Sequence, residues 1–315
     1  MADTEQQSGS GTTLTTWHQQ AFTAIGKWRW LGELTERATA VVDPLYDRFR
    51  ANPVVELAHG GRWVGHSLHP ALSDLPIGFW AGSLLLDTLD KDTGGRGRLD
   101  ASATLSAAGL ATAAATAATG VVDWSVSDGE DRKTGVFHGL LNTAAMVLHG
   151  ASLAARVSGR RGTAKALGAA GFAAVGAAGF VGGHLVQGRA LMVNRVATTG
   201  DGPTRWVQAI EEAELPDGSA AGVTVDGRQV MLLREGGNVH AIDDLCSHAG
   251  SLLSRGEVAG CLITCPLHYS VFDVRDGQIV RGPAHHPQPV LPTRVRNGWV
   301  EVRGSLPLGR GRKKD

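Results

Sequence analysis

Cysteine is scarce in this chain of 315 residues, which has three, all between Cys246 and Cys265. So few thiols in one short stretch exclude a disulfide-stapled scaffold. A net charge is also lacking, because 30 Lys and Arg balance 30 Asp and Glu. This balance argues against a nucleic-acid partner, and we interpret the basic tail, residues 305–315, as a solvated end.

A secretory signal is lacking as well, since residues 1–12 are polar and have no charged segment that leads into an apolar run. Their Gly, Ser, Thr and Gln content predicts disorder. Without an export signal, we expect the C-terminal part of the chain to lie in the cytoplasm. Lys and Arg counts on the two sides of the predicted membrane segments are nearly balanced and do not decide the orientation.

Charge is missing from three long stretches, 101–122, 134–155 and 166–188, and a fourth, 69–89, carries only Asp74 and Asp87. About twenty apolar residues cross the hydrocarbon core of a bilayer as a helix. Residues 61–195 are therefore predicted to form a four-helix transmembrane domain, in a multi-pass protein of a bacterial inner membrane. Their Ala and Gly content favours close helix packing. The alternative is a soluble Ala-rich bundle.

Residues 13–60 are predicted to be helical, with breaks at Asp43-Pro44 and Asn52-Pro53. Apolar side chains recur at roughly helical spacing, among them Trp17, Phe22, Ile25, Trp28, Leu31 and Leu34. Two interpretations stay open for this segment: a small packed helical unit, or an amphipathic element on the membrane surface.

Residues 204–304 are typical of an all-β domain. Short apolar runs alternate with hairpin signals at Asp226-Gly227, Gly236-Gly237, Asp276-Gly277 and Asn297-Gly298. The predicted strands are 222–225, 229–234, 239–243, 261–264, 271–274, 278–281, 293–296 and 299–303. The fold class is therefore α + β in separate domains, a four-helix transmembrane bundle followed by an all-β domain.

Two short motifs in the β domain carry the chemistry: Cys246-Ser247-His248 and Cys265-Pro266-Leu267-His268. Each offers one thiolate and one imidazole, which suits a two-iron two-sulfur cluster with two Cys on one iron and two His on the other. The alternative is a structural zinc site, since two Cys and two His also suit tetrahedral zinc. Cys261 is needed in neither scheme and is interpreted as a buried strand residue.

With both motifs, the Asp276-Gly277 turn and the segment Gly282-Pro283-Ala284, residues 204–304 resemble a Rieske ferredoxin-type domain. The resemblance implies one 2Fe-2S cluster under a proline loop that contains Pro283. It implies that Cys246 and Cys265 bind one iron, and that His248 and His268 bind the other through one ring nitrogen. The second ring nitrogen would face solvent and meet an electron partner.

Departures from the family pattern add three expectations. Ser251 and Leu267 stand where respiratory Rieske proteins have a disulfide, so the chain is closer to the ferredoxin and oxygenase type. Ser270 stands where a serine hydroxyl donates to a cluster sulfur, and such a bond raises the reduction potential. Tyr269 occupies a position that is usually glycine, and we expect it to crowd or shield His268.

The helical part resembles an uncharacterised four-helix membrane domain that recurs fused to Rieske domains. The resemblance covers about residues 56–195 and rests on four segments: 59–70, 75–78, 120–124 and 182–185. It supports a membrane bundle and implies nothing about chemistry.

A second set of polar residues is predicted at the membrane face from which the β domain emerges: His66, His69, Asp74, Asp123, His138, His149 and His184. Ionisable groups in or beside membrane spans indicate function by default. Polar contacts between helices, a b-type haem, a quinone pocket and a metal site all stay open.

Together these features predict a membrane-anchored Rieske electron-transfer protein that exchanges one electron at a time, an oxidoreductase component rather than a self-sufficient enzyme. Its partners would be the lipid bilayer and a redox donor or acceptor that the sequence does not identify. The alternatives are an electron-delivery component of an oxygenase or other oxidoreductase system, and a redox or iron sensor.

Overall fold

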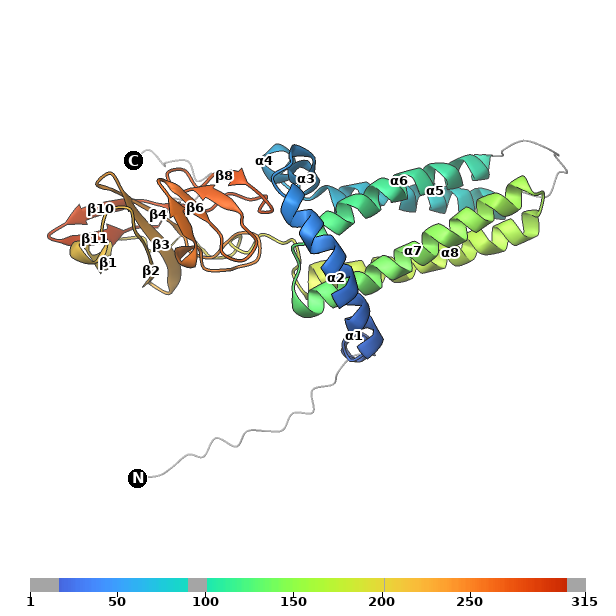
Figure 1. The fold of residues 1–315 in the computed structure, drawn as a ribbon, viewed down its shortest axis with the longest axis horizontal. Coiled ribbons are helices and arrows are strands. Elements are labelled where there is room, and N and C mark those ends of the chain that lie inside the picture. Colours follow the sequence, from blue (N-terminus) through green and yellow to red (C-terminus); the bar gives the residue numbers. More distant parts are fainter. Residues whose placement is uncertain (1–16, 90–100, 201, 305–315) are drawn as a thin grey trace, which may run out of the picture.

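The computed structural model describes residues 17–89, 101–200 and 202–304, which form a helical part followed by a β domain. Figure 1 shows an elongated molecule in which the β domain lies at one end of a long helical bundle. The predictions for residues 1–12 and 305–315 fall outside the described residues.

Four N-terminal helices lie at the end of the bundle that faces the β domain (Figure 1). They are α1 (Trp17–Gly26), α2 (Arg29–Phe49), α3 (Pro53–Ala58) and α4 (Gly61–Val64). The predicted break at Asn52-Pro53 is confirmed, because Asn52 caps α3 by accepting from Val54 N at 2.9 Å. The predicted break at Asp43-Pro44 is wrong. Proline removes a single backbone donor, and α2 continues through Pro44.

The bundle consists of four long helices, α5 (Leu68–Leu89), α6 (Ala101–Trp124), α7 (Gly129–Val157) and α8 (Arg161–Gly183), and η1 (His184–Gly188) extends α8. In Figure 1, α5 lies along α6 and α7 lies along α8, so the bundle is a pair of helical hairpins. Glycine allows the close approach: a Cβ at Gly109 on α6 would lie 2.4 Å from the Trp80 indole nitrogen on α5.

The two hairpins repeat the same contacts at equivalent positions. In the first, Ser83 Oγ on α5 donates to Ser102 O on α6 at 2.9 Å, and His69 Nδ1 lies 2.9 Å from Thr116 O. In the second, Ser152 Oγ on α7 donates to Ala164 O on α8 at 2.7 Å, and His138 Nδ1 lies 2.8 Å from Ala178 O. The bundle therefore has an approximate two-fold symmetry that relates α5 to α7 and α6 to α8.

Three contacts between the hairpins join positions that this symmetry makes equivalent. His69 faces His138 with ring centroids 6.2 Å apart, and Trp80 stacks on His149 at 4.1 Å with nearly parallel rings. Asp87 forms a buried ion pair with Arg156. The three pairs follow one stripe of each helix, because eleven and eighteen residues are close to whole numbers of turns.

Four membrane spans were predicted, and two of them meet the criteria of length and hydropathy for a membrane-crossing helix. Among the described residues, two helices are long and apolar enough to cross a membrane, Ala101–Trp124 and Arg161–Gly188. Asp74, Asp87 and two prolines lower the apolar character of α5, and α7 begins with four charged residues and carries His138, Asn142 and His149.

The β domain contains three small antiparallel sheets, with strand orders β1-β11-β10, β2-β3-β4-β9 and β5-β6-β7-β8. The strands are β1 (Val207–Glu211), β2 (Ala220–Val225), β3 (Arg228–Glu235), β4 (Asn238–Asp243), β5 (Glu257–Ala259), β6 (Leu262–Thr264), β7 (Val271–Asp273), β8 (Ile279–Arg281), β9 (Val290–Leu291), β10 (Thr293–Arg296) and β11 (Trp299–Val302). The eight predicted strands are present, and β1, β5 and β9 are additional. At Asp226-Gly227 and Asn297-Gly298 both residues have positive φ, as a tight hairpin turn requires.

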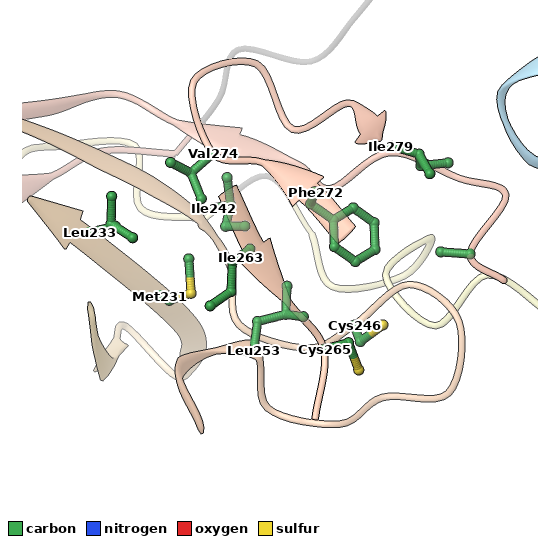
Figure 2. Packing of buried hydrophobic residues seen from close by; sticks show 11 residues of the cluster. Met231, Leu233, Ile242, Cys246, Leu253, Ile263, Cys265, Phe272, Val274 and Ile279 are labelled. Carbon is green, nitrogen blue, oxygen red and sulfur yellow. The ribbon is translucent and has the colours of Figure 1, made fainter. Parts of the chain in front are cut away.

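One apolar core of the β domain reaches the predicted cluster site. Figure 2 shows Met231, Leu233, Ile242, Ile263 and Phe272 packed together, with the Cys246 and Cys265 side chains near one another at the edge of this cluster. Two short 3-10 turns, η2 (Glu212–Glu214) and η3 (Leu253–Arg255), complete the domain. The core thus supports both cysteine-bearing loops from one side.

We predict that the Asp87–Arg156 pair contributes strongly to the stability of the bundle. Asp87→Ala removes the carboxylate that faces the buried guanidinium, and we expect a loss of about 3–5 kcal/mol. Thermal unfolding of the detergent-extracted full chain would measure the loss. Adding Arg156→Met to Asp87→Ala should recover much of it, and a loss below about 1 kcal/mol in the single variant would contradict the prediction.

Candidate iron–sulfur site

The two cysteine loops of the β domain have the same backbone geometry. One follows β4, and the other connects β6 to β7. In each loop the Cys N–H donates at 2.8 Å to a carbonyl five residues ahead, from Cys246 to Ser251 O and from Cys265 to Ser270 O. The Cys carbonyls accept from Gly250 N at 2.8 Å and from Tyr269 N at 3.1 Å. Two similar loops therefore present their Cys and His side chains to a common space.

The two thiols at this site are buried and interact directly. Cys246 is 1% exposed and Cys265 is 2% exposed. A hydrogen bond from the Cys246 thiol lowers the pKa of Cys265 to about 6, and the same bond together with burial raises the pKa of Cys246. One thiolate is thus available at neutral pH, and the second forms when metal displaces the shared proton.

The two imidazoles lie next to each other, with His248 and His268 ring centroids 4.9 Å apart and rings nearly perpendicular. Both Nδ1 atoms are buried and have no hydrogen-bond partner. Burial lowers the pKa of both rings, and Asp128 partly opposes this shift at His268. Neutral imidazoles with a free inward nitrogen are what metal ligation requires.

The donor set fits a two-iron cluster better than a single zinc ion. Across 17–89, 101–200 and 202–304, no three His, Cys, Asp or Glu side chains converge on one ion position. Tetrahedral zinc needs four such ligands around one point. A two-iron cluster needs two protein ligands for each iron, which the Cys pair and the His pair provide separately.

Ser270, which we expect to donate to a cluster sulfur, lies between the second loop and the proline loop. It is fully buried, and its Oγ accepts from Ala284 N at 2.9 Å. Because that bond uses an oxygen lone pair, the hydroxyl proton stays available for a sulfur acceptor. Pro283 precedes Ala284 in the same loop, and His285 is buried after it.

Tyr269 has the left-handed backbone that makes glycine usual at its position, with φ of +63°, like Gly250 in the other loop. Its ring lies under the Arg50 guanidinium, 4.1 Å from carbon to centroid. Arg50 follows α2, so this cation–π contact links the β domain to the helical part. The expected shielding of His268 by Tyr269 stays a prediction.

The outer nitrogen of His268 was expected to face solvent, and this is wrong. His268 Nε2 lies 2.9 Å from Asp128 Oδ2, in the turn between α6 and α7. The His268 side chain is 10% exposed and His248 is 5% exposed. The helical part folds back over the histidine edge of the site, a long-range contact that the sequence of the β domain alone does not reveal.

Behind this edge lies a buried polar network that sequence reasoning missed. His59 Nε2 lies 3.1 Å from the Tyr46 hydroxyl, and His59 Nδ1 lies 3.3 Å from Asp123 Oδ1. Ser67 Oγ donates to the other oxygen of Asp123. A Cβ at Gly282 would lie 3.9 Å from His59 Cβ, which places His59 against the proline loop. The sequence signal for His59 was its position as the first residue of the 59–70 segment.

The predicted membrane-face residues do not form a single site. His69 and His138 face each other, whereas Asp123 belongs to the His59 network. His149 stacks on Trp80 deeper in the bundle, and His184 stacks on Phe22 of α1 with centroids 3.5 Å apart. His66 bonds to Ser67 O, and Asp74 is exposed.

Replacing Ser270 by Ala is predicted to lower the midpoint potential of the cluster. The hydroxyl bond stabilises the more negative, reduced state, and roughly 1 kcal/mol of lost stabilisation equals about 40 mV in a one-electron couple. A redox titration followed by electron paramagnetic resonance measures the shift. Ser219→Ala, at a surface turn, is the control, and an equal midpoint in Ser270→Ala and the control would refute the role.

Comparisons with known proteins agree with this geometry. A family model of the Rieske (2Fe-2S) domain matches residues 205–293, and a model of a predicted membrane protein family (DUF2231) matches residues 65–195. The ferredoxin component of the naphthalene 1,2-dioxygenase system of Pseudomonas aeruginosa is 34% identical over 98 residues, which are 31% of this chain and 94% of that protein.

Two further relatives match the β domain. Sulredoxin of Sulfurisphaera tokodaii is 30% identical over 105 residues, 31% of this chain and 96% of that protein. The solved ferredoxin of carbazole 1,9a-dioxygenase from Nocardioides aromaticivorans is 33% identical over 32% of this chain and 98% of that chain, with a TM-score of 0.31. The chain therefore belongs to the Rieske 2Fe-2S family through its β domain, and it joins this domain to a predicted membrane protein domain.

Proposed function

We propose that the chain is a membrane-anchored one-electron carrier that exchanges electrons at the membrane face rather than with freely diffusing proteins. The observation that carries the proposal is the position of the histidine edge. His268 is hydrogen-bonded to Asp128 of the helical part, and both ligand imidazoles are nearly buried. An electron that leaves through these rings therefore enters the helical part first.

The packing of the bundle supports four crossings, although among the described residues only α6 and α8 with η1 qualify by hydropathy. Figure 1 shows α5 and α7 alongside them over most of their length, so a bilayer crossed by α6 and α8 would also surround α5 and α7. The outer faces carry exposed apolar side chains: Leu75, Ile77, Leu85, Leu140, Val147 and Phe180. The charges at Asp87 and Arg156 are paired inside.

The N-terminal helices support the same placement. Val41, Leu45 and Phe49 form an exposed apolar stripe on α2, and Trp17 and Trp30 are 69% and 50% exposed. Apolar stripes and tryptophans on a helix across the bundle end suit the headgroup region of a bilayer. We infer that α1 and α2 lie on the membrane surface beneath the β domain.

We place the β domain on the cytoplasmic side of a bacterial inner membrane. Ser251 and Leu267 stand where respiratory Rieske proteins have a disulfide, and the lack of that disulfide suits a reducing compartment. Protease digestion of spheroplasts and of inverted vesicles distinguishes the two orientations, because the β domain is cleaved only where it is exposed.

Within this function the residues have separate tasks. The cluster accepts or releases one electron when it is bound. Cys246 and Cys265 would hold one iron of the cluster, and His248 and His268 would hold the other. Asp128 accepts the His268 Nε2 proton in a hydrogen bond and fixes the ring orientation. Arg50, against Tyr269, helps to hold the domains together.

Electron delivery to an oxygenase is the second candidate, favoured by the ferredoxin components of dioxygenase systems among the relatives. Those relatives match the β domain alone, at about a third of this chain. A diffusing oxygenase would need the histidine edge that Asp128 and the bundle cover. A redox or iron sensor would share the cluster but show no rapid electron exchange.

Cell fractionation is expected to place the protein in alkali-washed membranes, together with a Rieske electron paramagnetic resonance signal. Detergent-extracted full chain, reduced with dithionite, should transfer its electron faster to a lipid-soluble quinone in nanodiscs than to soluble cytochrome c. A chain that stays soluble without detergent, or that contains no iron and acid-labile sulfide, would rule out the proposed function.

Asp128→Asn is predicted to raise the midpoint potential, because it removes a negative charge that disfavours the reduced cluster. Asp128 is 62% exposed at its side chain, so solvent screening limits the effect to about 1 kcal/mol, or roughly 40 mV. The redox titration used for Ser270 measures this change. Asp226→Asn, in a distant hairpin turn, is the control, and a lowered midpoint in Asp128→Asn would contradict the assigned contact.

A further inference from the structure

His69, near the start of α5, and His138, in the first half of α7, face each other across the two hairpins of the bundle. Their ring centroids are 6.2 Å apart and the rings are perpendicular. They come from α5 and α7 at equivalent positions of the repeated hairpins. The symmetry thus places two like imidazoles opposite each other.

Both rings are held in the same tautomer by backbone carbonyls. Nδ1–H of His69 donates to Thr116 O at 2.9 Å, and Nδ1–H of His138 donates to Ala178 O at 2.8 Å. A carbonyl cannot donate, so each Nδ1 carries the proton and each Nε2 keeps a lone pair. A carbonyl that receives Nδ1–H is the usual support of a metal-binding histidine.

Glycine makes room for each ring against the neighbouring helix. A Cβ at Gly120 on α6 would lie 2.8 Å from the His69 ring, and a Cβ at Gly182 on α8 would lie 3.1 Å from the His138 ring. Any larger residue would push the imidazoles out of these positions. The bundle therefore maintains a specific ring placement in both hairpins.

In each of the other two symmetry-related pairs, the two side chains already contact each other directly. Trp80 and His149 are stacked at 4.1 Å, and Asp87 and Arg156 are ion-paired. The His69 and His138 rings are not stacked. His138 Nε2 lies 3.1 Å from Asn142 Nδ2, an amide that can instead donate to His138 O at 3.0 Å. If a ligand binds His138 Nε2, the Asn142 amide therefore still has His138 O as its acceptor.

The chemistry of the pair favours haem over a bare ion. No third His, Cys, Asp or Glu joins the two imidazoles among the described residues. Two ligands are too few for an ordinary protein metal site. A porphyrin supplies four nitrogens, so its iron needs only two axial ligands, and bundle proteins hold such cofactors between facing helices.

We propose that His69 and His138 are the axial ligands of a b-type haem between the two hairpins. This inference extends the proposed function by identifying the membrane-side partner of the cluster, but haem binding itself does not depend on it. Held by these two imidazoles, a haem iron would take up the single electron that the reduced cluster gives up.

The test uses the full chain, expressed with a haem precursor and extracted in detergent. We expect the pyridine haemochrome assay to give one haem for each cluster counted from the Rieske resonance signal. The visible spectrum should be that of a low-spin haem. In His69→Ala and in His138→Ala, the haem content of the purified chain should fall at least tenfold. The Rieske signal should stay unchanged in both variants. His66→Ala is the matched control at the same bundle end and should retain both.

His69→Met covers the case in which the alanine variants fail to reach the membrane. It should retain haem with a changed spectrum and a raised haem potential, since methionine favours ferrous iron. A wild-type chain with a full Rieske signal and no haem would overturn the proposal. So would unchanged haem spectra in the His69 and His138 variants, or a metal without porphyrin at this pair.

Discussion

The hydrogen bond between His268 Nε2 and Asp128 Oδ2 is the contact on which the arrangement of this molecule depends. It joins a predicted iron ligand to the turn that connects the two helical hairpins. Arg50 against Tyr269, and His59 against the Gly282 loop, reinforce it on either side. Each contact alone contributes modestly, but three around one edge orient the cluster toward the bundle.

The bundle meets a different constraint, because polar residues inside it must find partners. It does so by symmetry: Asp87 faces Arg156, Trp80 covers His149, and the serines at positions 83 and 152 donate to carbonyls of the adjacent helices. This pairing explains how α5 and α7 carry charges and histidines beside the more apolar α6 and α8. At the level of His69 and His138, each Nδ1 donates to a carbonyl of the adjacent helix.

Prediction from sequence succeeded where a short motif fixes the local backbone. The C-x-H and C-x-x-H spacings placed Cys246, His248, Cys265 and His268 in two loops that do meet, and the Asp-Gly and Asn-Gly turns located the hairpins. It failed at Pro44, where α2 tolerates one lost hydrogen bond, and two of the four predicted spans meet the length and hydropathy criteria. Helix hydropathy is an average, and it cannot show that Asp87 is neutralised by a residue far along the chain.

The sequence by itself determined the β domain, its two Cys-His loops and the fusion to a helical part, because these follow from local spacing and turn chemistry. Tertiary structure decided which way the histidine edge of the β domain faces. It also separated the seven predicted membrane-face residues into the His69–His138 pair, Asp123 in the His59 network, and the remaining residues, which belong to neither of these groups. The physical reason is distance along the chain. Contacts such as His268 with Asp128, and His69 with His138, join segments whose proximity depends on how whole helices pack.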